Sequence, residues 1–424
     1  MKDYLSKLPK DLANLVYLTG EIAAKSRVGV YLVGGIVRDL ILGALNFDLD
    51  IVVQGDGIMF ATELAHCLHA KLTTHRRFGT ATLVTPKRIK LDIATCRSEF
   101  YPEPASLPVV SPGTIREDLA RRDFTINAMA VNLLPENFGS LVDFYQGKQD
   151  LEKGAIRILH DLSFVDDPTR IIRAVRFEQR LKFRIEPRTL RLLKQAVKRG
   201  MLKRVSPHRL RDEIILILKE PAVLKCILRL EKLVGFNFIH QKLKLGKGNL
   251  KFLTAVKSQI DWFNRNFPKH KNLDIWLMYF IGLLSSLNSA QINQVSKRFG
   301  LRRQEIKIIE SYHRFSSKQI LLLGKKNIQL SQVYRILQAL SPEAILLLRA
   351  KYTNKFLAQR IKLFFHKCMG IRIYIRGEDL TKLGLKPSPR YKRILNRLLY
   401  LQLDGQINSR AEALQWIKQW LLPS

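Results

Sequence analysis

The hydrophobic pattern changes near residue 150, and this change limits the folds open to the chain. Up to about residue 135, short apolar or alternating runs typical of strands are interleaved with stretches of helical periodicity. From about residue 152 onward the pattern is almost wholly helical. A chain of 424 residues is too long for one ordinary core. We therefore predict an α+β fold, in which a small mixed sheet with helices is followed by a long all-helical region.

The charges divide at the same place. Residues 1–150 hold 17 basic and 17 acidic side chains, whereas residues 151–424 hold 55 basic and 19 acidic ones and carry the whole net charge of +36. This asymmetry argues against an enzyme of small neutral metabolites with an even surface. It favours a neutral module joined to a basic body that binds a polyanion.

Cysteine spacing and hydropathy indicate in which cellular compartment the protein is expected. The four cysteines form no C-x-x-C pair, which argues against a disulfide framework or a zinc ribbon. The N-terminus has acidic residues and lacks the apolar region of a signal peptide. The longest apolar run, about thirteen residues from Ile275, is too short to span a bilayer. We expect a soluble cytoplasmic protein without a membrane partner.

A glycine pair lies where a predicted strand meets a predicted helix. The strand VGVYLV ends in Gly34-Gly35, and the helix IVRDLILG follows with Arg38 in its first turn. Paired glycines allow the backbone to approach a phosphate, and a helix start offers unpaired N–H groups. No Walker-type phosphate loop is present. The pair is either a phosphate site or simply a tight turn.

Two carboxylates open the next predicted strand. Asp48 and Asp50 point to the same side of it, because residues two apart in a strand share a face. Their mutual repulsion is costly unless a cation neutralises it, and Mg²⁺ binds through carboxylates and substrate phosphates. Asp92, in the alternating run RIKLDI, is a candidate third carboxylate. The alternatives are a solvated strand end for the pair and a surface position for Asp92.

These features together predict a site for a nucleotide and metal ions. Two Mg²⁺ ions held by carboxylates can orient a triphosphate, activate an attacking hydroxyl and stabilise the departing pyrophosphate. No Ser/His/Asp or Cys/His arrangement offers a competing chemistry.

The segment LVGGIVRDLILGALNFDLDIVV resembles the first motif of class II tRNA nucleotidyltransferases and bacterial poly(A) polymerases, members of the polymerase-β-like nucleotidyltransferase superfamily. The segment EDLARRDFTINAMA, residues 117–130, resembles their second motif. The resemblance implies a nucleotidyltransferase head over 1–150, a helical neck over 151–240, and a basic body and tail over 241–424 that bind tRNA. It also implies that Arg122, Asp123 and Asn127 contact the nucleotide, as do Gly34, Gly35 and Arg38.

A third match, SFVDDPTRIIRAVRF at residues 163–177, contains Asp167, Arg170, Arg173 and Arg176 at three-residue spacing. An Asp acceptor beside an Arg donor complements the amino group and ring nitrogen of cytosine or adenine, and it rejects guanine and uracil. In this family the motif is understood to select the base, which implies that role for Asp167 and Arg170, with Arg173 and Arg176 as nucleotide contacts. Asp167 could instead be only a helix cap before Pro168. Asp166 replaces the usual Glu.

The basic region should bind RNA through phosphate contacts. Basic residues are dense between 370 and 400, where three tyrosines are interleaved. The alternative is a solvated helix face. The candidate RNA contacts are Arg372, Arg376, Lys386, Arg390, Lys392 and Arg393.

The sequence thus predicts a Mg²⁺-dependent enzyme that adds C and/or A to tRNA lacking all or part of its 3′ CCA, using CTP or ATP and releasing pyrophosphate. No obligate protein partner is evident. A bacterial poly(A) polymerase is the nearest alternative, and an inactive RNA-binding protein on the same scaffold is an alternative of another class. Some bacteria divide CCA synthesis between two such enzymes. A-adding members often carry extra N-terminal domains that this sequence lacks, which favours CC addition.

Overall fold

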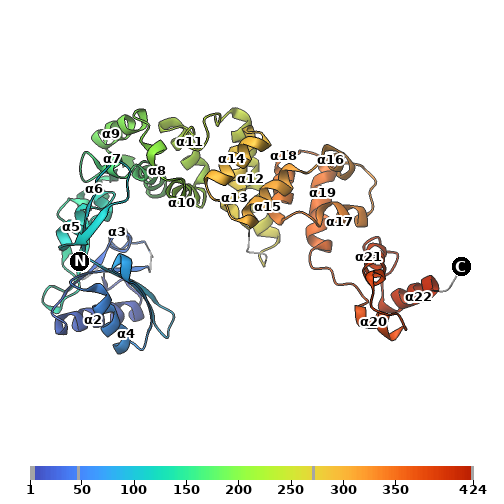
Figure 1. Ribbon diagram of the computed structural model, residues 1–424, viewed down its shortest axis with the longest axis horizontal. Helices are drawn as coiled ribbons and strands as arrows, with labels where there is room; N and C mark the ends of the chain where they lie inside the picture. Colours follow the sequence, from blue (N-terminus) through green and yellow to red (C-terminus); the bar gives the residue numbers. More distant parts are fainter. Residues whose placement is uncertain (1–4, 45–47, 270–272, 422–424) are drawn as a thin grey trace. The chain divides into compact units, whose positions relative to one another are not determined.

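The computed structural model describes residues 5–44, 48–269 and 273–421. Contacts divide the chain into two compact units, Met1–Phe238 and Ile239–Ser424 (Figure 1). A mixed sheet lies in the first unit and helices make up the second, which confirms the predicted α+β fold. The separation of a head over 1–150 from a neck over 151–240 stays a prediction.

The main sheet of the first unit has seven strands within the described residues, in the order β3-β4-β5-β2-β1-β8-β9. The central strands β2 and β5 run parallel, and their register pairs Asp50 with Asp92. All other neighbours in the sheet are antiparallel. The strands are β1 (Gly29–Val33), β2 (Leu49–Gln54), β3 (Lys71–His75), β4 (Thr80–Val84), β5 (Lys90–Thr95), β8 (Ala130–Asn132) and β9 (Leu141–Val142).

The alternation of side chains along β2 places Asp50 on the side of the strand opposite Leu49, Ile51 and Val53. Leu49, Ile51 and Val53 are buried on one side of the strand. On the other side Asp50 is exposed, and Val52, the next residue on that side, is buried in a hydrophobic cluster. The helix α4 (Gly57–Cys67) packs against β2, β4 and β5, and α2 (Lys10–Lys25) packs against β1 (Figure 1). The apolar side chains of the sheet therefore fix where the Asp50 carboxylate points.

A bundle of helices completes the first unit. The helices α10 (Pro207–Leu218) and α11 (Val223–Leu233) both pack on α8 (Thr169–Leu181). On α11, Arg229 holds Glu178 of α8 through two bonds, from Nε at 2.6 Å and from Nη2 at 2.8 Å. The packing of α10 brings its side chains to the start of α8, 40 residues earlier in the chain.

The proline-rich sequence between Tyr101 and Pro112 predicts a loop by composition, and this prediction is partly wrong. Residues Val109–Pro112 form β7, which pairs antiparallel with β6 (Arg97–Phe100) as a hairpin. Its prolines suggested a loop by composition, but an edge strand tolerates Pro112 because that position lacks a neighbour on one side. Only the connection between the two strands is irregular.

The second unit is helical within the described residues. The helix α12 (Lys247–Asn266) packs on α13 (Ile275–Leu283) and α18 (Pro342–Lys351). Residues 276–283 of α13 are all buried, which accounts for the long apolar run in the sequence. None of the described helices is both long and apolar enough to cross a membrane.

The last helices surround a small core of their own. They are α20 (Gly377–Lys382), α21 (Pro389–Leu403) and α22 (Arg410–Leu421). Leu380, Ile394, Leu398 and Ile417 are buried between them. The core orients the remaining faces of α20 and α21 toward solvent, and we refer to residues 371–421 as the tail.

Candidate active site

A cleft of about 660 Å³ lies in the first unit. Head strands, the β1–α3 turn, α8 and α10 contribute to it. Most of the predicted nucleotide residues line this one cleft: Gly34, Gly35, Arg38, Asp50, Arg122, Asp123, Asn127, Asp167, Arg170 and Arg173. Asp48, Asp92 and Arg176 are not among the lining residues. Segments more than 130 residues apart in the sequence therefore meet around one volume of nucleotide size.

Glycine is required at the turn between β1 and α3 (Gly35–Leu42). Gly34 has φ = +74°, and a Cβ atom there would lie 2.7 Å from Nη1 of Arg122. The backbone of this turn and the Arg122 guanidinium thus approach one another within the cleft. The Nε of Arg122 is buried and has no hydrogen-bond partner within the described structure, while its Nη2 donates to Asp118 at 2.9 Å. A phosphate at this turn would meet both backbone N–H groups and a guanidinium.

The carboxylates at the strand starts repel one another. Partial burial raises the pKa of Asp50, and the nearby Asp92 and Asp48 raise it further, while Arg122 opposes the shift. Both Asp48 and Asp50 are exposed. A divalent cation would relieve this repulsion, and Mg²⁺ needs only one or two protein carboxylates when waters and phosphates complete its shell. The residues present fit such an ion.

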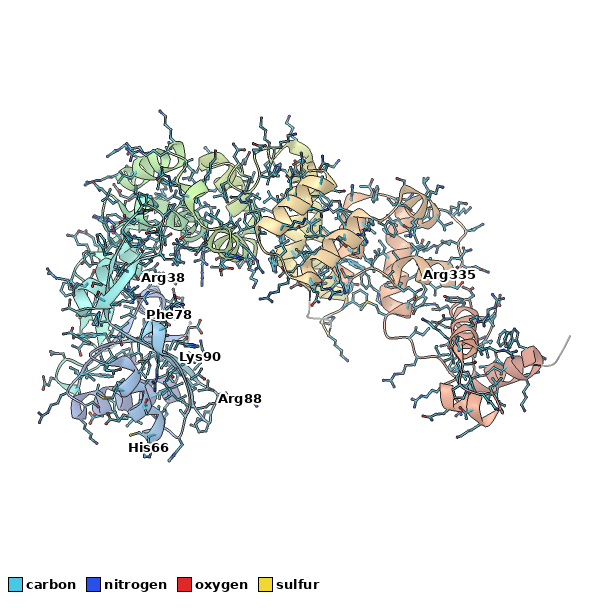
Figure 2. The ribbon with its side chains drawn as sticks, in the orientation of Figure 1. Arg38, His66, Phe78, Arg88, Lys90 and Arg335 are labelled. Atoms are coloured by element: carbon cyan, nitrogen blue, oxygen red, sulfur yellow. The ribbon has the colours of Figure 1, made fainter. Side chains whose placement is uncertain are left out.

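Asp92 is already engaged on both oxygens. Its Oδ1 accepts from Thr82 Oγ1 at 2.7 Å, and its Oδ2 lies 2.5 Å from Nζ of Lys90, which Figure 2 labels on the sheet. Within the described residues, no three His, Cys, Asp or Glu side chains gather closely enough to hold a metal ion by themselves. Asp92 thus sits beside Asp50 in the sheet register, and its two oxygens are held by β4 and β5.

A buried chain of polar contacts underlies the cleft. Arg38, labelled in Figure 2, donates to Asn127 Oδ1 at 2.7 Å and to Asp39 at 2.8 Å. Asn127 donates to Asp123 Oδ1 at 2.9 Å, and Arg173 donates to Asp123 Oδ2 from Nε at 2.9 Å and Nη2 at 2.6 Å. Burial would raise the pKa of Asp123, but Arg173 and Asn127 hold it below its usual value. These contacts connect the segment 117–130 to α8.

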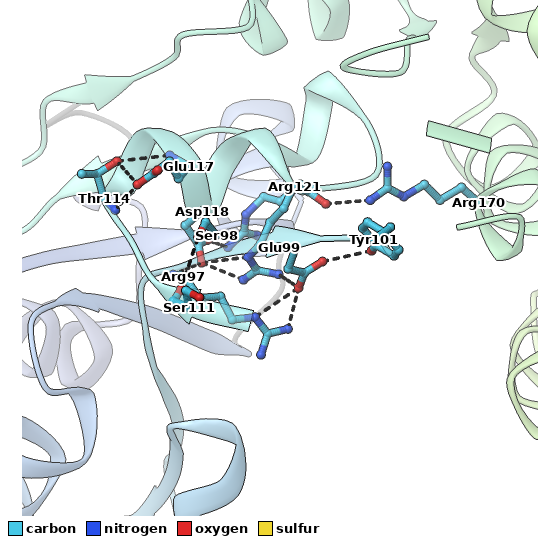
Figure 3. A network of polar contacts seen from close by, with 11 residues as sticks. Arg97, Ser98, Glu99, Tyr101, Ser111, Thr114, Glu117, Asp118, Arg121 and Arg170 are labelled. Carbon is cyan, nitrogen blue, oxygen red and sulfur yellow. Dashed lines mark hydrogen bonds and ion pairs between the residues drawn. The ribbon is translucent and has the colours of Figure 1, made fainter. Parts of the chain in front are cut away.

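A second network holds Arg121 and Arg122, and Figure 3 shows the part of it around Arg121, Asp118 and Glu99. The fully buried Asp118, on α5 (Ile115–Ala120), accepts from Arg121 Nη2 at 2.7 Å and from Arg122. Burial would raise the pKa of Asp118, but the two arginines hold it below its usual value. Arg121 also donates to Glu99 of the β6 strand at 3.1 Å, and Glu99 accepts from Tyr101 at 3.0 Å.

The candidate base-selecting pair is held rigidly. Arg170 is buried, and it donates from Nη1 to Ser163 Oγ at 2.6 Å and from Nη2 to the backbone oxygen of Arg121 at 2.7 Å, the contact drawn in Figure 3. Asp167 accepts from the backbone N of Thr169 at 3.0 Å, so it also caps the start of α8. Asp167 therefore both caps the helix and lines the cleft. The neighbouring Asp166 lies 3.9 Å from Nδ1 of His160 and does not line the cleft.

Arg176 is apart from the other three residues of its motif. Each three-residue step on an α-helix falls about 60° short of a full turn, so Arg176, two steps after Arg170, is rotated by about 120° from it around the helix. Arg176 is buried and is not among the lining residues, and its guanidinium lies 5.2 Å from the ring centroid of Phe177, which does line the cleft. Its predicted contact with the nucleotide stays a prediction.

Several residues that line the cleft had no role in the sequence prediction. Three of them, Arg209, Asp212 and Glu213, share one face of α10 at helical spacing. In the sequence, Ser206-Pro207 is a typical helix start, and the charged residues that follow it at helical spacing were the available signal. The other unpredicted lining residues are Glu99, Tyr101, Arg121, Thr169, Phe177 and Arg180.

The six candidate RNA contacts lie in the tail, and all of them are exposed. Arg390 lies 4.9 Å above the ring of Trp420, which stacks on Trp416 with centroids 6.0 Å apart. These residues form a basic surface with an aromatic edge, a combination suited to RNA.

The chain resembles known proteins in both sequence and structure. Residues 30–157 match the family described as the poly A polymerase head domain, and residues 182–243 match a probable RNA and SrmB-binding site of polymerase A. An A-adding tRNA nucleotidyltransferase of Geobacter sulfurreducens is 38% identical over 415 residues, covering 96% of this chain and 47% of that protein. One of Halalkalibacterium halodurans is 34% identical over 421 residues, covering 97% of this chain and 93% of that protein.

Solved structures of similar proteins indicate the same family as these sequence relatives. The Thermotoga maritima CCA-adding enzyme complexed with tRNA has a TM-score of 0.74 and 34% identity, with 99% of this chain and 98% of that chain covered. The chain spans about half the length of the Geobacter relative but nearly all of the Halalkalibacterium one. The predicted family is confirmed: the chain belongs to the tRNA nucleotidyltransferases that share their head with poly(A) polymerases.

Proposed function

We propose that this protein adds a nucleotide to the 3′ end of tRNA without a nucleic-acid template. The observation that carries this proposal is one cleft lined both by the strand carboxylate Asp50 and by the pair Asp167 and Arg170. Asp50 can serve metal and phosphate chemistry, and Asp167 with Arg170 can bind a base. All three line the same cleft. That arrangement suits a reaction in which the protein itself chooses the nucleotide.

The residues of the head would position the triphosphate. Asp48 and Asp50 would hold two Mg²⁺ ions, which when bound supply charge neutralisation and activation of the attacking hydroxyl. Arg122 would contact the phosphates, because its guanidinium borders the Gly34 turn. The terminal tRNA hydroxyl would attack the α-phosphorus, and pyrophosphate would leave. Asp123 and Asn127 would act through the buried chain that anchors Arg173, since both Asp123 oxygens already accept hydrogen bonds.

Base choice would rest on Asp167 and Arg170. The carboxylate accepts from an exocyclic amino group, and the guanidinium donates to the adjacent ring nitrogen. Adenine and cytosine present this order, whereas guanine and uracil present the reverse. Because Arg170 is buried and bonded to Ser163 and to the backbone of Arg121, it would offer its donors with little loss of conformational entropy.

We further propose that the nucleotide added is A. The relatives found by sequence that match most of this chain are named A-adding, whereas the CC-adding relative from Deinococcus radiodurans matches 190 residues. The competing proposal is addition of the full CCA, which the Thermotoga maritima CCA-adding enzyme favours because it also covers 99% of this chain. The expectation of CC addition rested on the lack of extra N-terminal domains. An A-adding relative of comparable length removes that argument. The tRNA substrate would then end in CC, and the site of action would be the cytoplasm.

The test is incorporation from each of the four nucleoside triphosphates on three tRNAs, ending at the discriminator base, at C and at CC. We expect one A to be added from ATP to the tRNA ending in CC, and the products are to be sequenced. Addition of CC to the shortest tRNA would support the earlier expectation instead. Long A tails would indicate a poly(A) polymerase, and no incorporation on any tRNA would indicate an inactive RNA-binding protein.

A further inference from the structure

Among the described residues, the hydrogen-bond donors around Asp167 reach one oxygen of its carboxylate, Oδ1. Its Oδ1 accepts from the Thr169 backbone N at 3.0 Å, from Thr169 Oγ1 at 2.6 Å and from Arg209 Nη2 at 2.7 Å. Thr169 is the local partner expected of a residue that caps a helix. Arg209 is different, because it reaches Asp167 from α10, about 40 residues further along the chain.

The Arg209 guanidinium has a second anchor. Its Nη1 donates to the backbone oxygen of Ala105 at 3.3 Å, and the backbone N of Ala105 donates to the oxygen of Val165 at 3.0 Å. Ala105 is buried and has φ = +64°, a conformation that a non-glycine residue adopts only when its surroundings impose it. Arg209 is thus fixed between the β6–β7 connection and the start of α8.

The helix that carries Arg209 is itself tied to the nucleotide cleft. Glu213, one turn further along α10, accepts from Arg173 Nη1 at 3.1 Å, and Arg173 in turn holds Asp123. Leu210 and Ile214 are buried in the packing of α10. Two side chains of α10 therefore connect to the cleft. Arg209 contacts Asp167 directly, and Glu213 contacts Arg173, which in turn contacts Asp123.

We propose that Arg209 is a positioning residue for base selection. By occupying Oδ1 of Asp167, it fixes the rotation of the carboxylate and reserves Oδ2 for the amino group of the incoming base. This inference rests on the proposed function of Asp167. Arg209 makes no contact with the base and acts through the orientation of the carboxylate.

The substitution Arg209→Met keeps the length of the side chain and removes its donors. Asp167 then keeps only its bonds to Thr169, and its carboxylate can turn away from the base. We expect the preference for ATP over GTP, measured as the ratio of kcat/KM values on a tRNA ending in CC, to fall about tenfold, as loss of one charged hydrogen bond allows. Arg209→Lys retains one donor and should restore part of the preference.

The matched control is Arg204→Met, which removes the same charge from an exposed position just before α10, outside the cleft. It should leave the preference unchanged. Both methionine variants should keep their affinity for tRNA and their Tm close to those of the parent protein. An equal loss of activity with all four nucleotides, at an unchanged ATP-to-GTP ratio, would show that Arg209 has only a structural role.

A double substitution tests whether Arg209 acts through Asp167. In an Asp167→Ala background, adding Arg209→Met should change the ratio of ATP and GTP dissociation constants less than twofold. A further tenfold change would overturn the proposal, since Arg209 would then contact the nucleotide on its own. The dissociation constants are measured by calorimetry without tRNA, so this arm gives a result even if the parent protein adds no A.

Discussion

The two units use positive charge differently. In the first, several of the arginines that line the cleft are held by carboxylates: Arg122 by Asp118, Arg173 by Asp123 and Glu213, and Arg209 by Asp167. In the second, 34 basic residues accompany 9 acidic ones, and the candidate RNA contacts are exposed. Paired guanidinium groups have fixed directions and can discriminate between ligands, whereas exposed ones supply attraction to any polyanion. We infer that selection belongs to the first unit and tRNA affinity mainly to the second.

The largest effect should follow from removing a catalytic carboxylate. Asp50→Ala should lower nucleotide incorporation by about a thousandfold or more, because the strand would lose a metal ligand facing the cleft. The affinity for tRNA should change less than threefold, as measured by filter binding at constant salt. Asp11→Ala removes an exposed carboxylate whose partner is Lys87 and serves as the control. Retained activity in Asp50→Ala would refute the metal assignment.

The sequence allowed much of this first unit to be predicted. The alternation around Asp50 and Asp92 predicted two strands with their carboxylates on one face, and the register pairs these residues. Local rules could not reveal Arg209, because only the packing of α10 on α8 brings it to Asp167. Glu99 was missed for a similar reason, since its role depends on Arg121 and on a hairpin whose prolines indicated a loop.

The second prediction concerns the stability of the first unit. Asp118→Asn should destabilise it by about 3–5 kcal/mol, because it removes the charge that two partly buried arginines share and leaves Arg122 without an ion-pair partner among the described residues, while Arg121 keeps only Glu99. The exposed pair of Asp161 with Arg188 provides the control, and Asp161→Asn should cost less than about 1 kcal/mol. Urea unfolding followed by circular dichroism measures both. Equal effects of the two variants would contradict the importance assigned to the buried network.

Acid should destabilise the first unit more than the second, because the buried ion pairs of Asp118 and Asp123 lie in the first unit. The pKa values of Asp118 and Asp123 are held below the ordinary value near 3.8, so the stability they contribute is complete above that value and is lost as the pH falls through their lower folded pKa values. All four tryptophans lie in the second unit, at positions 262, 276, 416 and 420. Below pH 4, hydrogen exchange should accelerate in the first unit while tryptophan fluorescence changes little.

The smallest expected effect is in the tail. Replacing Arg390, Lys392 and Arg393 together by Gln should weaken tRNA binding about tenfold at moderate salt and make the slope of log Kd against log salt shallower by about 2–3. The KM for ATP should stay unchanged, because the nucleotide cleft lies in the first unit. Replacing Lys257, Arg314 and Lys325, which lie in the second unit before the tail, is the matched control for net charge. A changed KM for ATP in the tail variant would contradict the separation of roles.

The most direct test of this separation is hydrogen exchange on the full chain with ATP alone, with tRNA alone and with neither. ATP should slow exchange at the β1–α3 turn, at η2 (Thr125–Asn127) and at the start of α8, and should leave residues 239–424 unchanged. The tRNA should slow exchange in the tail helices α20 and α21. Protection of the second unit by ATP, together with no change around the cleft, would contradict the claim that the first unit selects the nucleotide.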